Sequence, residues 1–297
     1  MSFEQIVYEH LRDSSTLEPF LAKYAEKPAV FNQQAPDDID PLWWDKSQYG
    51  RVIFAANLRG DPERKISGTL ILDVICHDGE QVPEEVEPVA RELIDGYFFS
   101  DEEEGVTFSA SWRNSAYFTD PTKSENGVTL EFDLLAYPNQ TTGDPDPIAL
   151  LNSWTKENLP DAFVIGTDEL PKVWKPTNES PAIYWRLINI SKCVWIPDTF
   201  SCSWQTATVT GHILTPDKQS RGQIAKWMSS YLTTKRRLIF PDNSPLMTDR
   251  NIRINPAADP MKQGQITLDA TYGILNEIPV AAPIKNISIN QKEGGNA

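Results

Sequence analysis

The chain has 297 residues, of which 40% are hydrophobic and 10% aromatic, a composition that supports the cores of two domains. No run of about 18 or more apolar residues occurs, and the first residues are amphipathic and acidic, so we expect neither a membrane-spanning helix nor a secretory signal. The cysteines are odd in number, which favours a reduced intracellular origin with Cys76, Cys193 and Cys202 as small core-filling residues.

The net charge of −15 is distributed unevenly along the chain. Residues 1–143 hold 11 Lys and Arg against 27 Asp and Glu, a net of −16, whereas residues 144–297 hold 16 against 15, a net of +1. Because counterion release needs clustered cations, the acidic half is a poor candidate for gripping a nucleic acid. An acidic surface near DNA repels the phosphates and prevents sticking. The alternative is that this charge serves solubility.

The first half is predicted to contain two helices and two pairs of strands. The turn-rich segment 34–49, with two prolines, should be a loop, and the charged turn 59–65 should close a hairpin. Apolar periodicity predicts a helix over 3–25, an extended piece over 28–32, strands over 51–57 and 68–78, a helix over 83–98, and strands over 106–118 and 127–137.

The strand over 68–78 and the helix over 83–98 form the most clearly patterned unit. Alternation places Leu70, Leu72, Val74 and Cys76 on one face of the strand. The helix opens with Pro83, Glu84 and Glu85, which suit a first turn with unpaired N–H groups and a positive dipole end. Its apolar positions at helical spacing, which can pack on the sheet, are Val86, Val89, Ala90, Leu93, Ile94 and Phe98.

The second half repeats the order of the first. Equivalent elements lie about 131 to 138 residues apart, and a near-constant offset marks the duplication of one domain plan. The predicted elements are a helix over 148–158, an extended piece over 162–165, a loop over 167–179, strands over 181–188 and 204–214, a helix over 219–232 and a strand over 265–275.

This order predicts an α+β protein with two similar tandem domains, each a mainly antiparallel sheet with helices packed on one face. We place the first domain at 1–138 and the second at 148–277. The proline-rich segment 139–147 is predicted to be a linker, and the Pro-, Asn- and Gly-rich segment 278–297 an extended tail.

Motifs that carry chemistry are missing from the sequence. The histidines His10, His77 and His212 stand without a Cys-x-x-Cys or His-x-x-x-His pattern, and no glycine-rich nucleotide or nucleophile motif is present. Cys76 and His77 are adjacent in a strand, so their side chains point to opposite faces and make a poor nucleophile–base pair. We therefore expect no metal, no cofactor and no enzymatic activity.

Two charged runs follow the two amphipathic helices at corresponding places and are the candidate assembly-interface charges. They are Asp101, Glu102, Glu103 and Glu104 in the first domain and Lys235, Arg236 and Arg237 in the second. Opposite charge at equivalent positions suits contact between subunits, or two different partners. The alternative is that both are solvated turns at helix ends, and the cationic run also suits a negative helix C-terminus.

The order of elements resembles the tail terminator, or tail completion, proteins of long-tailed bacteriophages. The resemblance rests on the N-terminal helix, the Pro- and Asp-rich loop, the charged hairpin, the strand Gly68–Cys76 with Leu72-Asp73-Val74 at its centre, the helix Val86–Phe98 and the closing strand Val128–Leu135. It covers residues 1–138 well and residues 148–277 more loosely. Since typical members have one domain, the chain resembles a tandem version of that family.

The resemblance implies a structural virion protein that caps the tail tube as a ring, stops tube polymerisation and forms the tail side of the head–tail junction. The implied partners are further copies of the chain (six favoured, three as the alternative), the tail tube protein, the head–tail connector and also the tail sheath. DNA would pass an acidic lumen without sequence-specific binding, and no membrane is involved. The implied location is the head-proximal end of the virion tail, assembled in the bacterial cytoplasm. The alternative is a tandem α+β binding or regulatory protein of a bacterial cell with no virion role.

Overall fold

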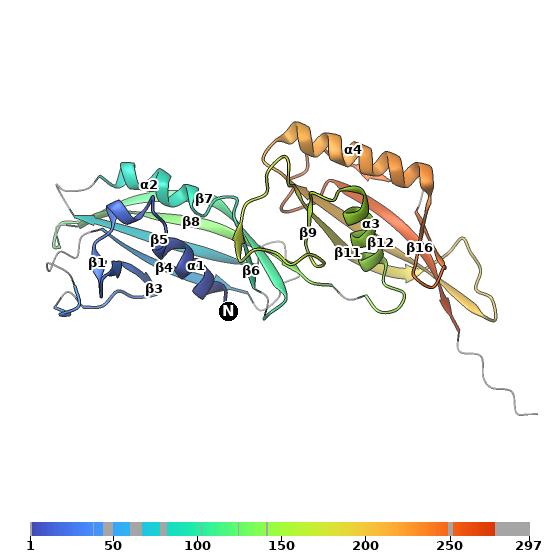
Figure 1. The fold of residues 1–297 in the computed structure, drawn as a ribbon, viewed down its shortest axis with the longest axis horizontal. Coiled ribbons are helices and arrows are strands. Elements are labelled where there is room, and N and C mark those ends of the chain that lie inside the picture. Colours follow the sequence, from blue (N-terminus) through green and yellow to red (C-terminus); the bar gives the residue numbers. More distant parts are fainter. Residues whose placement is uncertain are drawn as a thin grey trace, which may run out of the picture.

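The structure, a computed structural model, describes residues 2–37, 39–43, 50–59, 67–77, 82–101, 103–123, 125–140, 142–248 and 252–276. The protein is α+β and consists of two similar tandem domains, each built from a curled sheet with helices on one face (Figure 1). The predicted tail 278–297 lies outside the described residues.

The first domain follows the predicted order and adds the short pair β1–β2 after the first helix and a strand after the second. Its elements are α1 (Phe3–Arg12), the 3₁₀ turn η1 (Glu18–Phe20), β1 (Lys23–Tyr24), β2 (Lys27–Pro28), β3 (Val30–Asn32), β4 (Arg51–Leu58), β5 (Gly68–His77), α2 (Pro83–Glu92), β6 (Phe98–Asp101), β7 (Val106–Asp120) and β8 (Glu125–Pro138).

The second domain contains the remaining elements. They are α3 (Pro147–Asn158), β9 (Phe163–Val164), β10 (Val173–Trp174), β11 (Ala182–Lys192), β12 (Cys202–Leu214), α4 (Lys218–Lys235), β13 (Arg237–Ile239), β14 (Pro245–Thr248), β15 (Arg253–Ile254) and β16 (Ile266–Leu275).

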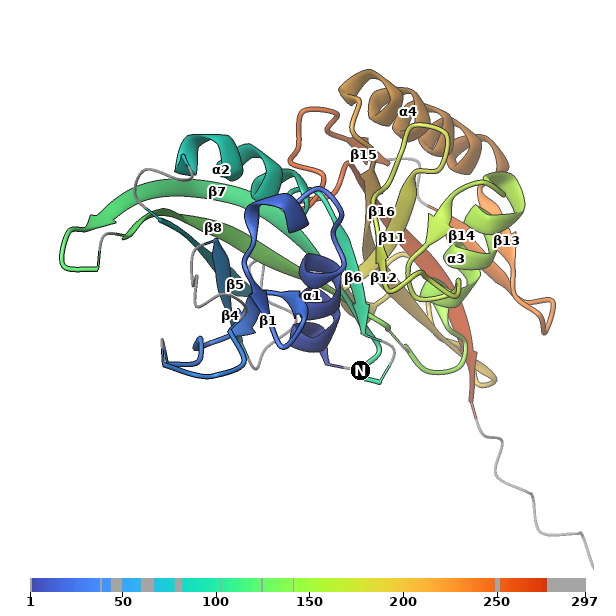
Figure 2. The same cartoon turned by 60° about the vertical axis from the view of Figure 1, so that its left-hand side comes forward.

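The sheets of the two domains share one topology. The first has the order β10-β6-β7-β8-β5-β4-β3 and the second the order β13-β14-β16-β12-β11-β9, so each strand from β3 to β8 has a counterpart once β10 is set aside. In both sheets the strand next to the first helix, β3 or β9, pairs parallel with its neighbour, and the other pairings are antiparallel. The domains differ in the hairpin β7–β8, which is long and curves beyond the rest of the first sheet (Figure 2).

The first core confirms the predicted faces of β5. Leu70, Leu72, Val74 and Cys76 are all buried, and they pack with residues of α1 and α2. Burial of aliphatic side chains is the main favourable term in such a core. Cys193 is also buried, whereas Cys202 is only half-buried, so the core-filling prediction holds for two of the three free cysteines.

Two predicted helices are shorter than expected. The first ends at Arg12 rather than at residue 25, because Ser14 uses its hydroxyl to accept from the N–H of Leu17 and so begins a turn. The second ends at Glu92 rather than at Phe98, because Gly96 adopts a left-handed conformation (φ +76°) and redirects the chain into β6.

Candidate assembly surfaces

The two domains are joined by a strand that crosses from one to the other. β10 lies within the predicted loop 167–179, yet it pairs antiparallel with β6 and so extends the first sheet. The backbone N–H of Ser100 donates to the carbonyl of Lys172 at 2.9 Å. The Trp174 ring stacks on Phe98 with centroids 4.8 Å apart, and its Nε1–H donates to the Ser100 hydroxyl at 3.2 Å. The junction is therefore both hydrogen-bonded and packed.

An aromatic cluster continues this junction behind β10. Its buried residues, drawn from both domains, are Phe98, Leu135, Tyr137, Ile165, Trp174, Ala182, Tyr184 and Leu214. Polar contacts surround it: the Lys262 ammonium lies 3.3 Å from the Asp133 carboxylate, and the Lys175 ammonium donates to the carbonyl of Asp95 at 2.8 Å. A junction with its own core is expected to hold the domains in one arrangement.

His212 is buried within the same junction. Its Nδ1 lies 2.8 Å from the carbonyl of Pro260, to which it donates, and its ring lies against Tyr137 and Tyr184. Burial away from water lowers the pKa of His212 to about 4, only partly offset by the hydrogen bond to Pro260. The ring is therefore neutral at neutral pH, and charging it would weaken the junction.

The predicted linker 139–147 begins with a side chain that is bound to the second domain. The Gln140 amide nitrogen donates to the Tyr184 hydroxyl at 2.7 Å and to the carbonyl of Trp185 at 2.9 Å. The Gln140 side-chain oxygen accepts from the N–H of Leu187 at 2.9 Å. This part of the linker lies along β11 and fixes where the second domain starts.

The junction is heterologous, meaning that the domains use different surfaces to meet. The first domain contributes the β6 side of its sheet, whereas the second contributes the β9 side and the loop that carries β10. The β3 side of the first domain (Figure 1) and the β13 side of the second (Figure 2) therefore face away from this junction. Two like units in head-to-tail contact leave one unused edge at each end.

A second surface is the tip of the hairpin β11–β12, at the end of the second domain. Three large apolar side chains are exposed there, with exposed fractions of 96% for Val194, 63% for Trp195 and 78% for Phe200. Leu275, which pairs with Cys202 at the end of β16, is similarly exposed. Clustered exposed apolar side chains on a folded domain mark interaction sites.

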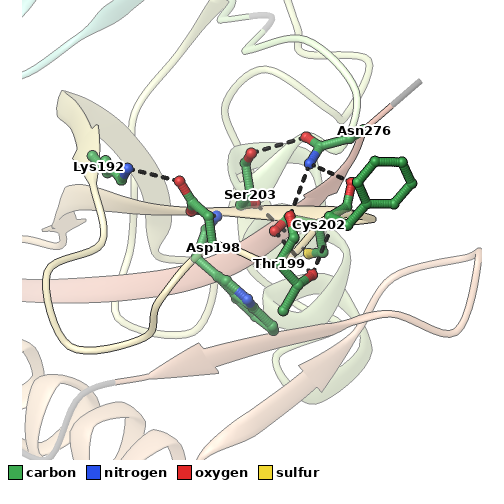
Figure 3. Close-up of polar contacts among 8 residues, drawn as sticks. Lys192, Asp198, Thr199, Cys202, Ser203 and Asn276 are labelled. Atoms are coloured by element: carbon green, nitrogen blue, oxygen red, sulfur yellow. Dashed lines mark hydrogen bonds and ion pairs between the residues drawn. The ribbon is translucent and has the colours of Figure 1, made fainter. Parts of the chain in front are cut away.

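Hydrogen bonds and an ion pair fix the shape of this tip (Figure 3). Asp198 accepts from the N–H of Trp204 at 3.0 Å and pairs with the Lys192 ammonium at 2.7 Å, and these contacts lower the pKa of its carboxyl. Asn276 donates to the carbonyls of Thr199 and Phe200, both at 3.2 Å. A tip held in this way presents its apolar side chains at little entropic cost on binding.

The acidic run lies in the turn between β6 and β7. Asp101 is buried, and its carboxylate accepts from the N–H groups of Glu103 and Glu104 at 3.1 and 3.2 Å, so it holds the turn together. Glu103 and Glu104 are exposed, and Glu102 lies outside the described residues. Asp101 is buried and ends β6, which separates it from α2. It is therefore not part of a solvated turn at the end of a helix.

The cationic run lies where α4 ends and β13 begins. Arg236 has a left-handed conformation (φ 57°) and caps α4, with its N–H donating to the carbonyl of Leu232. Lys235, Arg236 and Arg237 are exposed, and within the described part of the chain none of them forms an ion pair. These charges are available to a partner.

No family model matches the chain, and no curated protein shows significant similarity to it. Among the described residues, no group of three or more His, Cys, Asp or Glu side chains is placed to bind a metal ion. None of the described helices has both the length and the apolar character that crossing a bilayer requires.

The exposed tip of β11–β12 was not among the sites predicted from the sequence. The signal was present: segment 192–202 separates two strands and combines a Pro-Asp pair, typical of turns, with Val194, Trp195 and Phe200. Large apolar residues in a turn have no core to enter. The segment therefore predicts an exposed contact surface.

Proposed function

We propose that the chain is a structural virion protein that caps the tail tube of a long-tailed phage as a ring. It would end tube polymerisation and form the tail side of the head–tail junction. The observation that carries the proposal is the head-to-tail contact between two domains of one plan. Repeated heterologous contacts generate a ring when the rotation between units closes. The β3 and β13 sides of the chain, which end their sheets among the described strands, are available for the contacts needed.

The charge distribution supports a ring around DNA. Residues 1–143 carry a net charge of −16, which would repel phosphates from a lumen wall and let DNA pass without adhering. Such a role needs no catalytic group and no cofactor. It needs rigid sheets and surfaces that bind neighbours.

The tip of β11–β12 suits contact with the next layer of the tail, either the tube or the connector. Its apolar side chains are exposed and its backbone is fixed by the contacts of Asp198 and Asn276. Truncating a buried aromatic side chain at the centre of a protein interface often costs about 2–4 kcal/mol of binding free energy. We therefore assign the tip to docking between layers.

The proposal is tested by growing tail tubes from the tube protein of the phage or prophage that encodes the chain, with and without the chain present. We expect tubes of limited length that do not elongate when fresh tube protein is added. Electron microscopy of negatively stained samples measures the length distribution. Unlimited growth in the presence of a molar excess of the chain contradicts the proposal and favours a tandem binding or regulatory protein.

A double substitution at the tip, Trp195→Ser with Phe200→Ser, is expected to weaken tube capping by at least about tenfold in the concentration required. Stability should change little, because both side chains are exposed. The matched control is Val82→Ser, which alters an exposed apolar side chain at the start of α2. Equal capping by the tip variant and the control would assign docking to another surface.

A further inference from the structure

The second domain has a groove between α3 and β13. Its volume is about 780 Å³, and its apolar lining includes Leu150, Trp154, Ile239 and Phe240. Ile239 is 54% exposed although it lies in a strand. An apolar groove beside a strand suits an extended peptide with apolar side chains.

The edge of β13 is open to a further strand. Its pairing with β14 is flanked by hydrogen bonds from Thr248 to Arg236 and from Phe240 to Ser244. Since hydrogen-bonded residues alternate along an antiparallel pair, the backbone groups of Arg237 and Ile239 point away from β14. Among the described strands, none pairs with that side of β13. An uncovered edge of this kind is a template for strand addition.

The corresponding place in the first domain is filled. β6 is the counterpart of β13 and α1 of α3, and β10 lies along β6 beside α1. Val173 packs against the core of the first domain, and together with Lys172 it borders a cleft that Ile6 and His10 of α1 also line. In the first domain, then, a short strand from another domain is already paired at the place that corresponds to the groove between α3 and β13.

The first domain carries a segment that matches β10. β10 comes from the loop between β9 and β11, and the counterpart loop runs from β3 to β4. Both loops contain an apolar residue followed by tryptophan, Leu42-Trp43 and Val173-Trp174, and both tryptophans pack on a phenylalanine of the preceding strand: Trp43 on Phe31 at 5.6 Å and Trp174 on Phe163 at 4.9 Å. In the first domain this segment forms a turn in which Trp43 is buried and bridges to Tyr24 of β1, and the Leu42 carbonyl accepts from the N–H of Ala25 at 2.9 Å. Ile39 and Leu42 remain exposed, at 91% and 52%, and pairing as an added edge strand requires the turn to extend.

Charge supports contact between unlike domains. The internal contact brings the cationic segment Lys172–Lys175 to the acidic first domain. In the external contact the acidic residues Asp37 and Asp40 would approach the edge that begins with Lys235, Arg236 and Arg237. Head-to-tail association sets the half of net charge −16 against the half of net charge +1, whereas pairing two first domains would set −16 against −16.

Acidic side chains also line the groove, but local bonds engage two of them. Asp146 accepts from the N–H groups of Ile148 and Ala149 at the start of α3, at 2.9 and 3.0 Å. Asp242 accepts from the N–H and the hydroxyl of Ser244, at 2.9 and 2.7 Å. The positive end of the α3 dipole partly offsets the charge of Asp146. The hydrogen bonds from Ser244 lower the pKa of Asp242 and keep its carboxylate ionised.

We propose that the groove between α3 and β13 binds residues 39–43 of a second copy of this chain as an added edge strand. Copies then join head-to-tail through a contact that repeats the one inside each chain. The proposal deepens the proposed function, on which it rests for the closed ring. A ring in which internal and external contacts are alike has twice as many domains as chains, so a ring with six domains has three chains.

The test is a pair of cysteines, Leu42→Cys with Ile239→Cys, in a chain whose half-buried Cys202 is replaced by serine. Leu42 precedes Trp43, which bridges to Tyr24 of β1, and Ile239 lies in β13. β1 and β13 belong to different domains and stand well apart (Figure 2), so a disulfide between the two positions must join two copies. Mild oxidation is expected to give a ladder of linked multimers. The control pair, Leu42→Cys with Leu275→Cys, is at least as exposed and should stay unlinked.

Two further variants measure the strength of the contact. We expect Ile239→Lys to raise the dissociation constant of self-association by at least about tenfold. A separate triple variant, Lys235→Glu with Arg236→Glu and Arg237→Glu, should raise it by a similar factor. Lys226→Glu on the exposed side of α4 is the control for charge, and thermal unfolding checks that each variant is folded.

The outcomes separate this inference from the proposed function. If rings persist in Ile239→Lys and the cysteine pair is not linked, the inference about the groove is wrong, whereas the proposed ring still stands. Linked multimers that fail to stop tube growth support the inference and contradict the proposed function. A chain that stays monomeric at all concentrations contradicts both.

Discussion

Trp174→Ala is expected to lower the free energy of unfolding by about 3–5 kcal/mol, the usual loss for a buried aromatic side chain. Trp174 is buried between Phe98 and Phe163, so the substitution removes the centre of the junction between the domains. The hydrogen bond to Ser100 is lost as well. Chemical denaturation followed by circular dichroism measures the change, and small-angle scattering should report a wider range of interdomain arrangements.

The matched control is Trp195→Ala, which removes the same side chain from an exposed position. Its effect on stability should stay within about 0.5 kcal/mol. If Trp174→Ala and Trp195→Ala behave alike, then the junction is not held by the packing of β10 against β6. The contact between the two domains would then no longer indicate how one chain binds the next.

The second large effect is a loss of stability in acid that depends on His212. Burial lowers the pKa of His212 in the folded chain to about 4, below its unfolded value of 6.5, so the unfolded chain binds the proton more readily. The stabilising contribution is therefore fully present above the unfolded pKa and is lost as the pH falls towards 4. The loss amounts to roughly 3 kcal/mol between pH 7 and pH 4.

His212→Gln is the variant that isolates this effect, because glutamine can donate to the carbonyl of Pro260 but does not titrate. Denaturation at a series of pH values should show wild type losing more stability than the variant between pH 6.5 and 4. Carboxylates titrate equally in both proteins, so the difference reports His212 alone. Parallel curves for the two proteins would contradict a buried neutral histidine at the junction.

Much of the fold could be predicted from the sequence, because its main strands and helices carry strong apolar periodicity. Leu70, Leu72, Val74 and Cys76 alternate over a long strand, and the structure buries all of them. The repeated order of elements indicated a duplicated domain, and the matching strand orders of the two sheets agree with that prediction.

The short strands β10 and β13 were not predicted, whereas β3 and β9 at the other sheet edges fall within the predicted extended pieces 28–32 and 162–165. β10 and β13 have two and three residues, and each takes its conformation from a neighbouring strand rather than from its own sequence. The contact between β10 and β6 joins residues about 75 positions apart in the chain. It arises from tertiary packing around Trp174, which no local pattern reports.

The candidate site was predicted only in part. The cationic run at Lys235–Arg237 was identified by its charge, and the structure places it at the open edge of β13. In the acidic run, Asp101 is buried and engaged in its own turn, whereas Glu103 and Glu104 are exposed, and the role of the run in assembly stays a prediction. The groove between α3 and β13 combines side chains from 143 to 242, a juxtaposition that requires the fold to be known.

We propose that copies of this chain join head-to-tail into a ring that sits on the end of a tail tube. Native mass spectrometry of the purified chain, with electron microscopy of the same sample mixed with tail tubes, tests it most directly. We expect a single closed oligomer, of six chains or of three, and rings at one end of the tubes only. A chain that remains monomeric alone and with tubes, or that coats tubes along their length, would contradict it.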